Sequence, residues 1–71
     1  MNTLQATIER AAELAYREDA NQIVGRIDGV WEIAHTEDVG RQALMQRPLF
    51  TIGSEGLDDK DLEEAREYGW Q

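Results

Sequence analysis

The fold is decided by residues 22–35, which read Gln-Ile-Val-Gly-Arg-Ile-Asp-Gly-Val-Trp-Glu-Ile-Ala-His. Two β-prone runs flank the dipeptide Asp28-Gly29. A pair of this kind is typical of a two-residue hairpin turn, because both central residues need a positive φ angle. The spacing therefore predicts a hairpin in which Arg26 faces Trp31 across the strands. Arg26 then forms a cation–π pair with the indole or covers the ring with its aliphatic stem.

Both faces of the predicted hairpin are apolar. The first face carries Ile23, Ile27, Val30 and Ala34, and the second carries Val24, Arg26, Trp31 and Ile33. The pattern leaves open which of the two faces packs against a helix, and a shift by one residue would exchange them. The face left over is a surface on which a second copy of the chain could bind. A small dimerising interaction or regulatory module, with the hairpin and Trp31 and Trp70 as apolar anchors, is therefore one function that the sequence allows.

Helical patterns lie on both sides of the hairpin. Apolar residues recur at helical spacing over residues 2–19, which predicts an amphipathic helix with Asn2 and Gln5 as a capping pair. A second, weaker pattern covers residues 36–47. Thr36 is the expected N-cap of this second helix, and Pro48 is expected to end it, since the residue before a proline is disfavoured in helical geometry.

The last third of the chain predicts one strand and one helix. Leu49–Ile52 is a short β-prone run that we expect to join the hairpin as a third strand. Residues 58–68 predict a helix with Asp58 as its N-cap, and Gly69 stands where a left-handed C-terminal cap is expected, with Trp70 folding back onto Ala65. These elements give one α+β domain over residues 1–71, in the order α-β-β-α-β-α, with a three-stranded sheet and helices packed on it.

Composition excludes several classes of protein. The chain has 71 residues, a net charge of −8, no Cys and one His. We expect no disulfide, no metal site and no cofactor, and no apolar run approaches the roughly 20 residues that cross a bilayer. No basic region followed by an apolar stretch marks a secretory signal, so a soluble intracellular protein is expected. The negative charge argues against direct binding to nucleic acid or to a membrane surface.

No group of residues resembles an active site. His35 has acidic neighbours in the sequence, but the same residues serve as the start of a helix, and a triad is defined by geometry rather than by adjacency. Ser54 lacks the Gly-x-Ser-x-Gly spacing of a nucleophile elbow. The run Asp58–Asp61 lacks the ligand order of a calcium loop. We therefore expect a protein that is not an enzyme.

The acidic charge is concentrated near the C-terminus. Residues 53–71 hold seven acidic and two basic side chains, a net charge of −5 out of −8 for the chain. Within a helix over residues 58–68, Asp59, Glu63 and Glu67 would form one acidic ridge at i,i+4 spacing. Such a ridge is either a solvated face that keeps a small protein soluble or a surface that binds a basic partner. The candidate partner-binding residues are Asp58, Asp59, Asp61, Glu63, Glu64 and Glu67, with Glu55, Glu32 and Trp31 at the edge.

The whole chain resembles small acidic phage-encoded proteins, and anti-CRISPR inhibitors in particular. Three features carry the resemblance: the helix at 3–19, the hairpin Gly25-Arg26-Ile27-Asp28-Gly29-Val30-Trp31-Glu32, and the acidic run Leu57-Asp58-Asp59-Lys60-Asp61-Leu62-Glu63-Glu64. It covers the general architecture of all 71 residues and transfers no functional residue. It implies a non-enzymatic inhibitor that acts as a DNA mimic and blocks the basic, nucleic-acid-binding groove of a partner such as a Cas complex.

Overall fold

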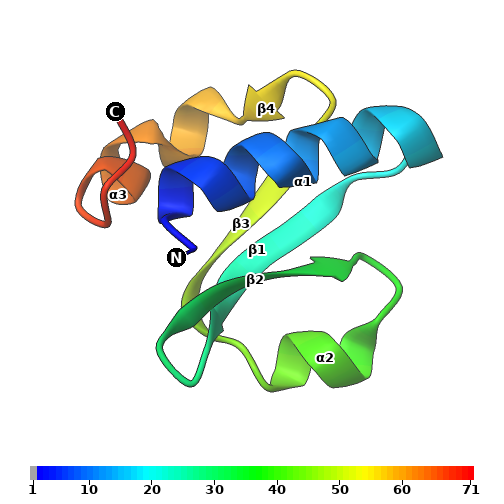
Figure 1. The fold of residues 1–71 in the computed structure, drawn as a ribbon, viewed down its shortest axis with the longest axis horizontal. Helices are drawn as coiled ribbons and strands as arrows, with labels where there is room; N and C mark the ends of the chain where they lie inside the picture. Colours follow the sequence, from blue (N-terminus) through cyan, green and yellow to red (C-terminus); the bar gives the residue numbers. More distant parts are fainter. Residues whose placement is uncertain (1) are drawn as a thin grey trace.

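The computed structural model describes residues 2–71 and has an α+β fold (Figure 1). Its sheet has four antiparallel strands in the order β2-β1-β3-β4, one strand more than the sequence predicts. In chain order the elements are α1 (Leu4–Glu18), β1 (Gln22–Ile27), β2 (Val30–His35), α2 (Val39–Ala43), β3 (Gln46–Gly53), β4 (Gly56–Leu57), the 3-10 helix η1 (Asp59–Asp61) and α3 (Leu62–Arg66). Figure 1 shows α1 and the C-terminal elements on one side of the sheet and α2 on the other.

The predicted hairpin is confirmed. Strands β1 and β2 pair in the expected register, with Arg26 opposite Trp31. Asp28 and Gly29 both adopt positive φ angles, 52° and 79°, as a two-residue turn of this type requires. The local sequence thus determines this part of the sheet, because turn chemistry and strand alternation point to the same register.

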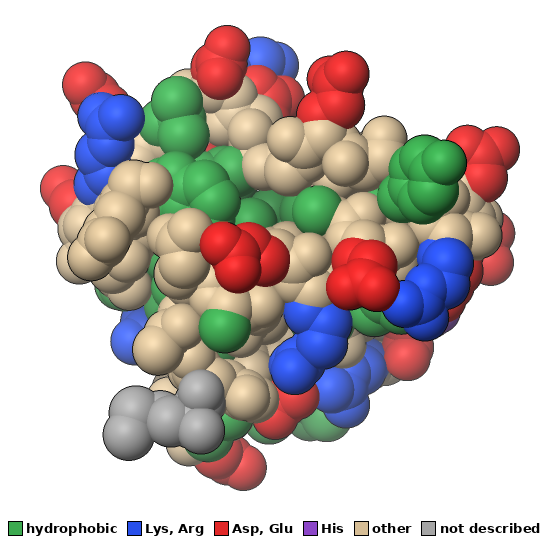
Figure 2. Space-filling model, turned by 45° about the horizontal axis from the view of Figure 1, so that its top comes forward, with side chains coloured by type: hydrophobic (Ala, Val, Ile, Leu, Met, Phe, Trp, Pro, Cys, Tyr) green, Lys and Arg blue, Asp and Glu red, His purple; other side chains and the backbone are tan. Residues whose placement is uncertain are grey.

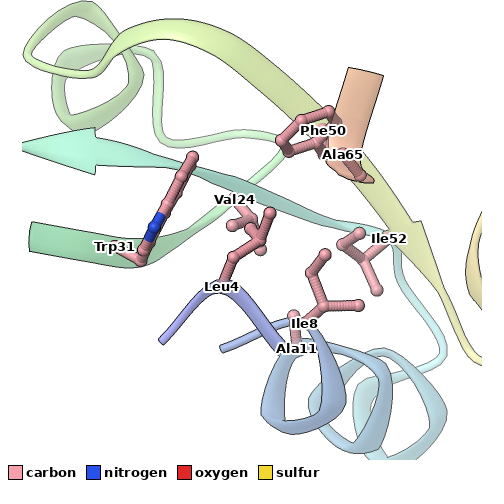
Figure 3. Close-up of a cluster of buried hydrophobic side chains, with 8 residues drawn as sticks. All are labelled: Leu4, Ile8, Ala11, Val24, Trp31, Phe50, Ile52 and Ala65. Carbon is pink, nitrogen blue, oxygen red and sulfur yellow. The ribbon is translucent and has the colours of Figure 1, made fainter. Parts of the chain in front are cut away.

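The structure decides which face of the hairpin is covered by α1. The buried cluster combines Leu4, Ile8 and Ala11 of α1 with side chains of the second face described above and with β3 (Figure 3). Its remaining members are Val24, Trp31, Phe50, Ile52 and Ala65. The opposite face is covered in part by Met45, whose side chain lies against Gly25 of β1. A Cβ atom at Gly25 would lie 2.5 Å from Leu49 Cδ2, so this position accepts only glycine without a local rearrangement.

The third strand is longer than predicted, and its location corrects the role of Pro48. Strand β3 begins at Gln46, pairs with β1 and has an irregular register between Val24 and Arg26. Pro48 therefore lies inside the strand and does not end a helix. Helix α2 ends at Ala43 because the chain enters β3, the partner of β1, at Gln46. Of the two connecting residues, Met45 is buried on the sheet. The two-residue strand β4, which pairs with the end of β3, was not predicted.

Two predicted helix starts were also wrong. Thr3, not Asn2, is the N-cap of α1, and its Oγ1 accepts a hydrogen bond from the backbone N–H of Ala6 at 3.0 Å. The Asn2 side chain instead donates to the carbonyl oxygen of Trp31. Helix α2 begins after Asp38, whose carboxylate accepts from the N–H of Arg41, so the predicted N-cap at Thr36 is two residues early. In both cases the predicted residue and the observed cap have the same capping chemistry and lie close together in the sequence. Which of the two caps the helix depends on where the helix packs on the sheet.

Candidate functional site

The acidic residues of interest lie in residues 53–71, here called the C-terminal acidic segment. The predicted single helix over residues 58–68 is wrong in detail, because the chain forms the 3-10 helix η1 and then the five-residue α3. A 3-10 helix has three residues per turn, whereas an α-helix has 3.6. Asp59 therefore lies out of line with Glu63 and Glu67, and only the latter two keep the spacing of the predicted ridge. Pairing of Leu57 in β4 and burial of Ala65 fix both ends of this short connection.

The predicted caps of this segment are confirmed. The Asp58 carboxylate accepts a hydrogen bond from the N–H of Lys60 at 3.1 Å. Gly69 has a φ angle of 110°, and the N–H of Trp70 donates to the carbonyl of Ala65 at 3.0 Å. The N–H of Gly69 donates to the carbonyl of Arg66, which completes a Schellman motif. Both ends of the helical run are thus specified by local sequence.

Three side chains fix the C-terminal acidic segment to the sheet. Ala65 is fully buried against the core, and Trp70 packs on the same cluster. The ring of Tyr68 meets the edge of Trp31 at 6.0 Å between centroids and an interplanar angle of 83°. Arg26 lies over both rings, with Cζ 5.2 Å from the Trp31 centroid and 5.1 Å from that of Tyr68. This geometry confirms the cation–π pair between Arg26 and Trp31. The participation of Tyr68 was missed, since no local signal brings residue 68 to the hairpin.

The acidic side chains of the segment project into solvent. Six of the seven are exposed and Asp61 is half-buried. Among residues 2–71, none of the seven carboxylates lies within ion-pair distance of a basic side chain. Figure 2 looks onto this side of the molecule and shows acidic side chains standing out along its upper edge, with hydrophobic side chains exposed between them. The net charge of −5 is therefore not neutralised within the fold. The acidic members are Glu55, Asp58, Asp59, Asp61, Glu63, Glu64 and Glu67.

Two predicted edge residues lie apart from this surface. Trp31 is 8% exposed and belongs to the core, so its ring supports the segment from beneath and is not a surface anchor. Glu32 alternates with Trp31 and points to the other side of the sheet, where it pairs with Arg41 of α2 at 3.3 Å. The structure thus places Glu55, Asp58 and Asp59 around one hollow and Glu64 at another, with Glu32 on the other side of the sheet and Trp31 buried beneath Tyr68.

His35 pairs with Glu18 at the surface. Its Nε2 atom lies 3.1 Å from a carboxylate oxygen of Glu18, and both side chains are substantially exposed. Over residues 2–71 no group of three His, Cys, Asp or Glu side chains has the geometry of a metal site. In the same part of the chain, no helix has the length and apolar character that crossing a bilayer requires.

Two open hollows border the C-terminal acidic segment. The larger, of about 530 Å³, is lined by Thr51, by Asn21 and by residues 53–59. The smaller, of about 260 Å³, is lined by Glu64, Tyr68 and residues 47–49. Residues of β3 line both hollows, together with acidic residues of the segment. The outer edge of β3 and these acidic side chains therefore face the same region of solvent.

Comparison of the chain with protein-family models, with curated proteins and with solved structures finds no match. The functional interpretation is therefore based on the chain's own chemistry.

Proposed function

We propose that this protein is a non-enzymatic inhibitor of the anti-CRISPR type. In this proposal the C-terminal acidic segment binds the basic, nucleic-acid-binding groove of a partner protein complex and takes the place of the phosphate backbone. The supporting observation is the cluster of seven carboxylates in residues 53–71 that have no basic partner within the described chain. The partner complex would be met in the bacterial cytoplasm.

The uncompensated charge supports binding to a basic surface. Acidic side chains that already pair within a fold lose those pairs when they bind elsewhere, whereas these carboxylates have no such pairs to break. A surface of this sign raises the association rate with Lys- and Arg-lined grooves, and the effect weakens as salt screens the charges. We therefore expect binding that depends strongly on ionic strength.

The anchoring of the segment supports the same function. An isolated helix of five residues is not stable in water, so the position of α3 depends on its contacts with the sheet. Burial of Ala65, packing of Trp70 and the stack of Arg26 with Trp31 and Tyr68 provide those contacts. The carboxylates are thus presented from a preformed surface, which lowers the entropic cost of binding.

The test is inhibition of target-DNA binding by purified CRISPR effector complexes, followed by fluorescence polarisation of labelled DNA at 50 and 300 mM salt. The informative variant combines Asp59→Asn, Glu63→Gln and Glu67→Gln, which removes three charges at nearly constant volume. We expect inhibition by the parent chain at the lower salt concentration and at least a tenfold loss of potency in the variant, since each lost charge pair contributes about 1 kcal/mol.

A matched control removes the same charge elsewhere. Glu9→Gln, Asp19→Asn and Glu37→Gln together change three exposed acids outside the C-terminal acidic segment. This control should keep the potency of the parent chain to within about twofold, if position rather than net charge decides binding. Equal losses in both triple variants, or no inhibition of any effector complex at low salt, would contradict the proposal.

A second proposed function, a dimerising interaction module, is favoured by exposed apolar side chains around α2. Val39 and Leu44 are 72% and 67% exposed, and Val30 at the hairpin turn is 43% exposed. These residues, rather than Trp31, would form the contact between two copies. Sedimentation of the parent chain and of the Val39→Ser/Leu44→Ser variant at micromolar concentration tests this function. A parent chain that sediments as a monomer would exclude it.

A further inference from the structure

The outer edge of β3 differs from the outer edge of β2. In the pairing of β1 with β3, Val24 faces Phe50 and Gln22 faces Ile52. The two-residue turn makes Ile27 and Val30 a hydrogen-bonded pair, so alternate residues of β1 bond to β2 and the others, Gln22 and Val24, bond to β3. The N–H and C=O groups of Phe50 and Ile52 therefore point to β1, and those of Leu49, Thr51 and Gly53 point outward. Gly53 pairs with Gly56 of β4. Leu49 and Thr51 lie beyond the end of β4.

No described residue completes this edge. Strand β4 ends at Leu57, and the chain leaves the sheet at Asp58, which would otherwise lie opposite Thr51. Within residues 2–71, the outward N–H and C=O groups of Leu49 and Thr51 have no hydrogen-bond partner in a turn, a loop or a side chain. Unpaired groups of this kind are a template for an additional strand.

The space beside this edge is open. Thr51 lines the larger hollow together with Asp58 and Asp59, and Leu49 lines the smaller one together with Glu64 and Tyr68. The two hollows lie at the two ends of the unpaired stretch, and the Thr51 side chain is exposed. An extended peptide backbone could therefore lie beside Leu49 and Thr51, beyond the end of β4. It would not have to displace any side chain of the core.

At the opposite edge of the sheet, by comparison, the outward carbonyls are covered. The outward carbonyls of β2 belong to Trp31, Ile33 and His35, because the alternate residues of this strand face β1. They accept hydrogen bonds from Asn2 Nδ2, from Arg41 Nε at 2.8 Å and from Gln42 Nε2 at 2.7 Å, in that order. An added strand at β2 would have to break these bonds, whereas at β3 there are none to break.

We propose that the edge of β3 at Leu49 and Thr51 binds an extended, Lys- or Arg-containing segment of a protein partner as an additional antiparallel or parallel strand. Backbone hydrogen bonds to Leu49 and Thr51 hold the segment, and the carboxylates of Asp58, Asp59 and Glu64 select its basic side chains. This inference rests on the proposed function, because it names the form in which a basic partner meets the C-terminal acidic segment.

The probe for this proposal is the peptide acetyl-(Lys-Thr)4-amide, compared with two versions that are N-methylated on every lysine or on every threonine backbone nitrogen. All three peptides carry the same charge. In an added strand, the N–H groups of one residue type face β3 and those of the other face solvent. We expect one N-methylated peptide to bind about tenfold more weakly than the parent peptide, because it loses backbone hydrogen bonds, and the other to bind nearly as well.

Amide hydrogen exchange of the protein locates the contact. With the parent peptide bound, exchange at the N–H groups of Leu49 and Thr51 should slow about tenfold, and exchange at the outward N–H groups of Ile33 and His35 should not change. A variant adds a second line of evidence, since Thr51→Pro removes one outward N–H at an edge position, where proline is tolerated. It should weaken the parent peptide about fivefold, whereas Thr51→Val, which keeps the N–H, should not.

The outcomes separate this inference from the proposed function. If all three peptides bind equally and lose affinity equally with salt, strand addition is wrong and the acidic surface alone binds the basic partner. If none binds at 10 mM salt, both the added strand and the acidic binding surface are wrong. A difference between the two N-methylated peptides, together with slowed exchange at Leu49 and Thr51, supports the added strand.

Discussion

The two long edges of the sheet are held in place by different means. Strand β2 has its outward carbonyls closed by the side chains of Asn2, Arg41 and Gln42. Strand β3 has no such polar cover at Leu49 and Thr51, but it places Phe50 and Ile52, both fully buried, in the core. The difference shows two ways to hold an edge strand. Strand β2 is held from its side, by side chains that bond its outward carbonyls, and β3 is held from its face, by its own side chains buried in the core. Of the two, only the edge that is secured from its face keeps its outward carbonyls free for a partner.

The largest expected effect tests the dependence of β3 on the core. Phe50→Ala should lower the free energy of unfolding by about 3–5 kcal/mol, because it removes a fully buried ring and leaves a cavity. A chain of this length has a total stability of roughly 4–10 kcal/mol, so the variant would lose a large share of it. Urea unfolding followed by tryptophan fluorescence measures the change. Its control, Thr51→Ala on the exposed side of the same strand, should cost no more than about 1 kcal/mol.

An intermediate effect tests the side chains that bond the outward carbonyls of β2, here called the cover of β2. Arg41 donates from Nε to the carbonyl of Ile33 and pairs with Glu32. Arg41→Ala should lower the free energy of unfolding by about 1–2 kcal/mol, since a part-buried carbonyl loses a charged donor. The matched control is Arg17→Ala, which removes an exposed ion pair with Glu13 and should cost about 0.5 kcal/mol or less. Equal costs in urea unfolding would show that the cover of β2 contributes no more than a surface ion pair.

The smallest expected effect concerns Asn2. Its Nδ2 atom is 3.3 Å from the carbonyl oxygen of Trp31, a long hydrogen bond from the first described residue of the chain. Asn2→Ala should lower the free energy of unfolding by about 0.5 kcal/mol. In the double variant with Arg41→Ala, two outward carbonyls of β2 become free, so we expect self-association at concentrations where the parent chain sediments unchanged. Unchanged sedimentation of the double variant would mean that these side chains do not protect the edge.

Much of the fold could be predicted because its signals are local. The Asp28-Gly29 turn and its flanking alternation gave the register of the hairpin, and Asp58 and Gly69 gave the ends of the last helical run. The α+β class was predicted for the same reason. Strand β4 and the extension of β3 to Gln46 were missed, since a two-residue strand and a strand that contains Pro48 have no distinctive pattern of their own.

The candidate site was predicted in composition but not in geometry. The seven acids of residues 53–71 are visible in the sequence, and none of them forms an ion pair with a basic side chain of residues 2–71. Their predicted alignment as one ridge failed because η1 has a different number of residues per turn from α3. Whether Glu32 and Trp31 join them depends on which face of the hairpin is covered by α1, and two apolar faces look alike in the sequence.

By itself, the sequence determined the hairpin register, the caps of the C-terminal segment and the concentration of negative charge in residues 53–71. These depend on contacts between residues a few positions apart, or on composition alone. Only the tertiary structure decided that Trp31 is buried, that Arg26 joins the hairpin to Tyr68, and that the outward carbonyls of β2 are covered whereas those of Leu49 and Thr51 in β3 find no partner among residues 2–71. Those features depend on pairs of residues far apart in the chain, whose meeting is fixed by burial of a shared core rather than by any local pattern.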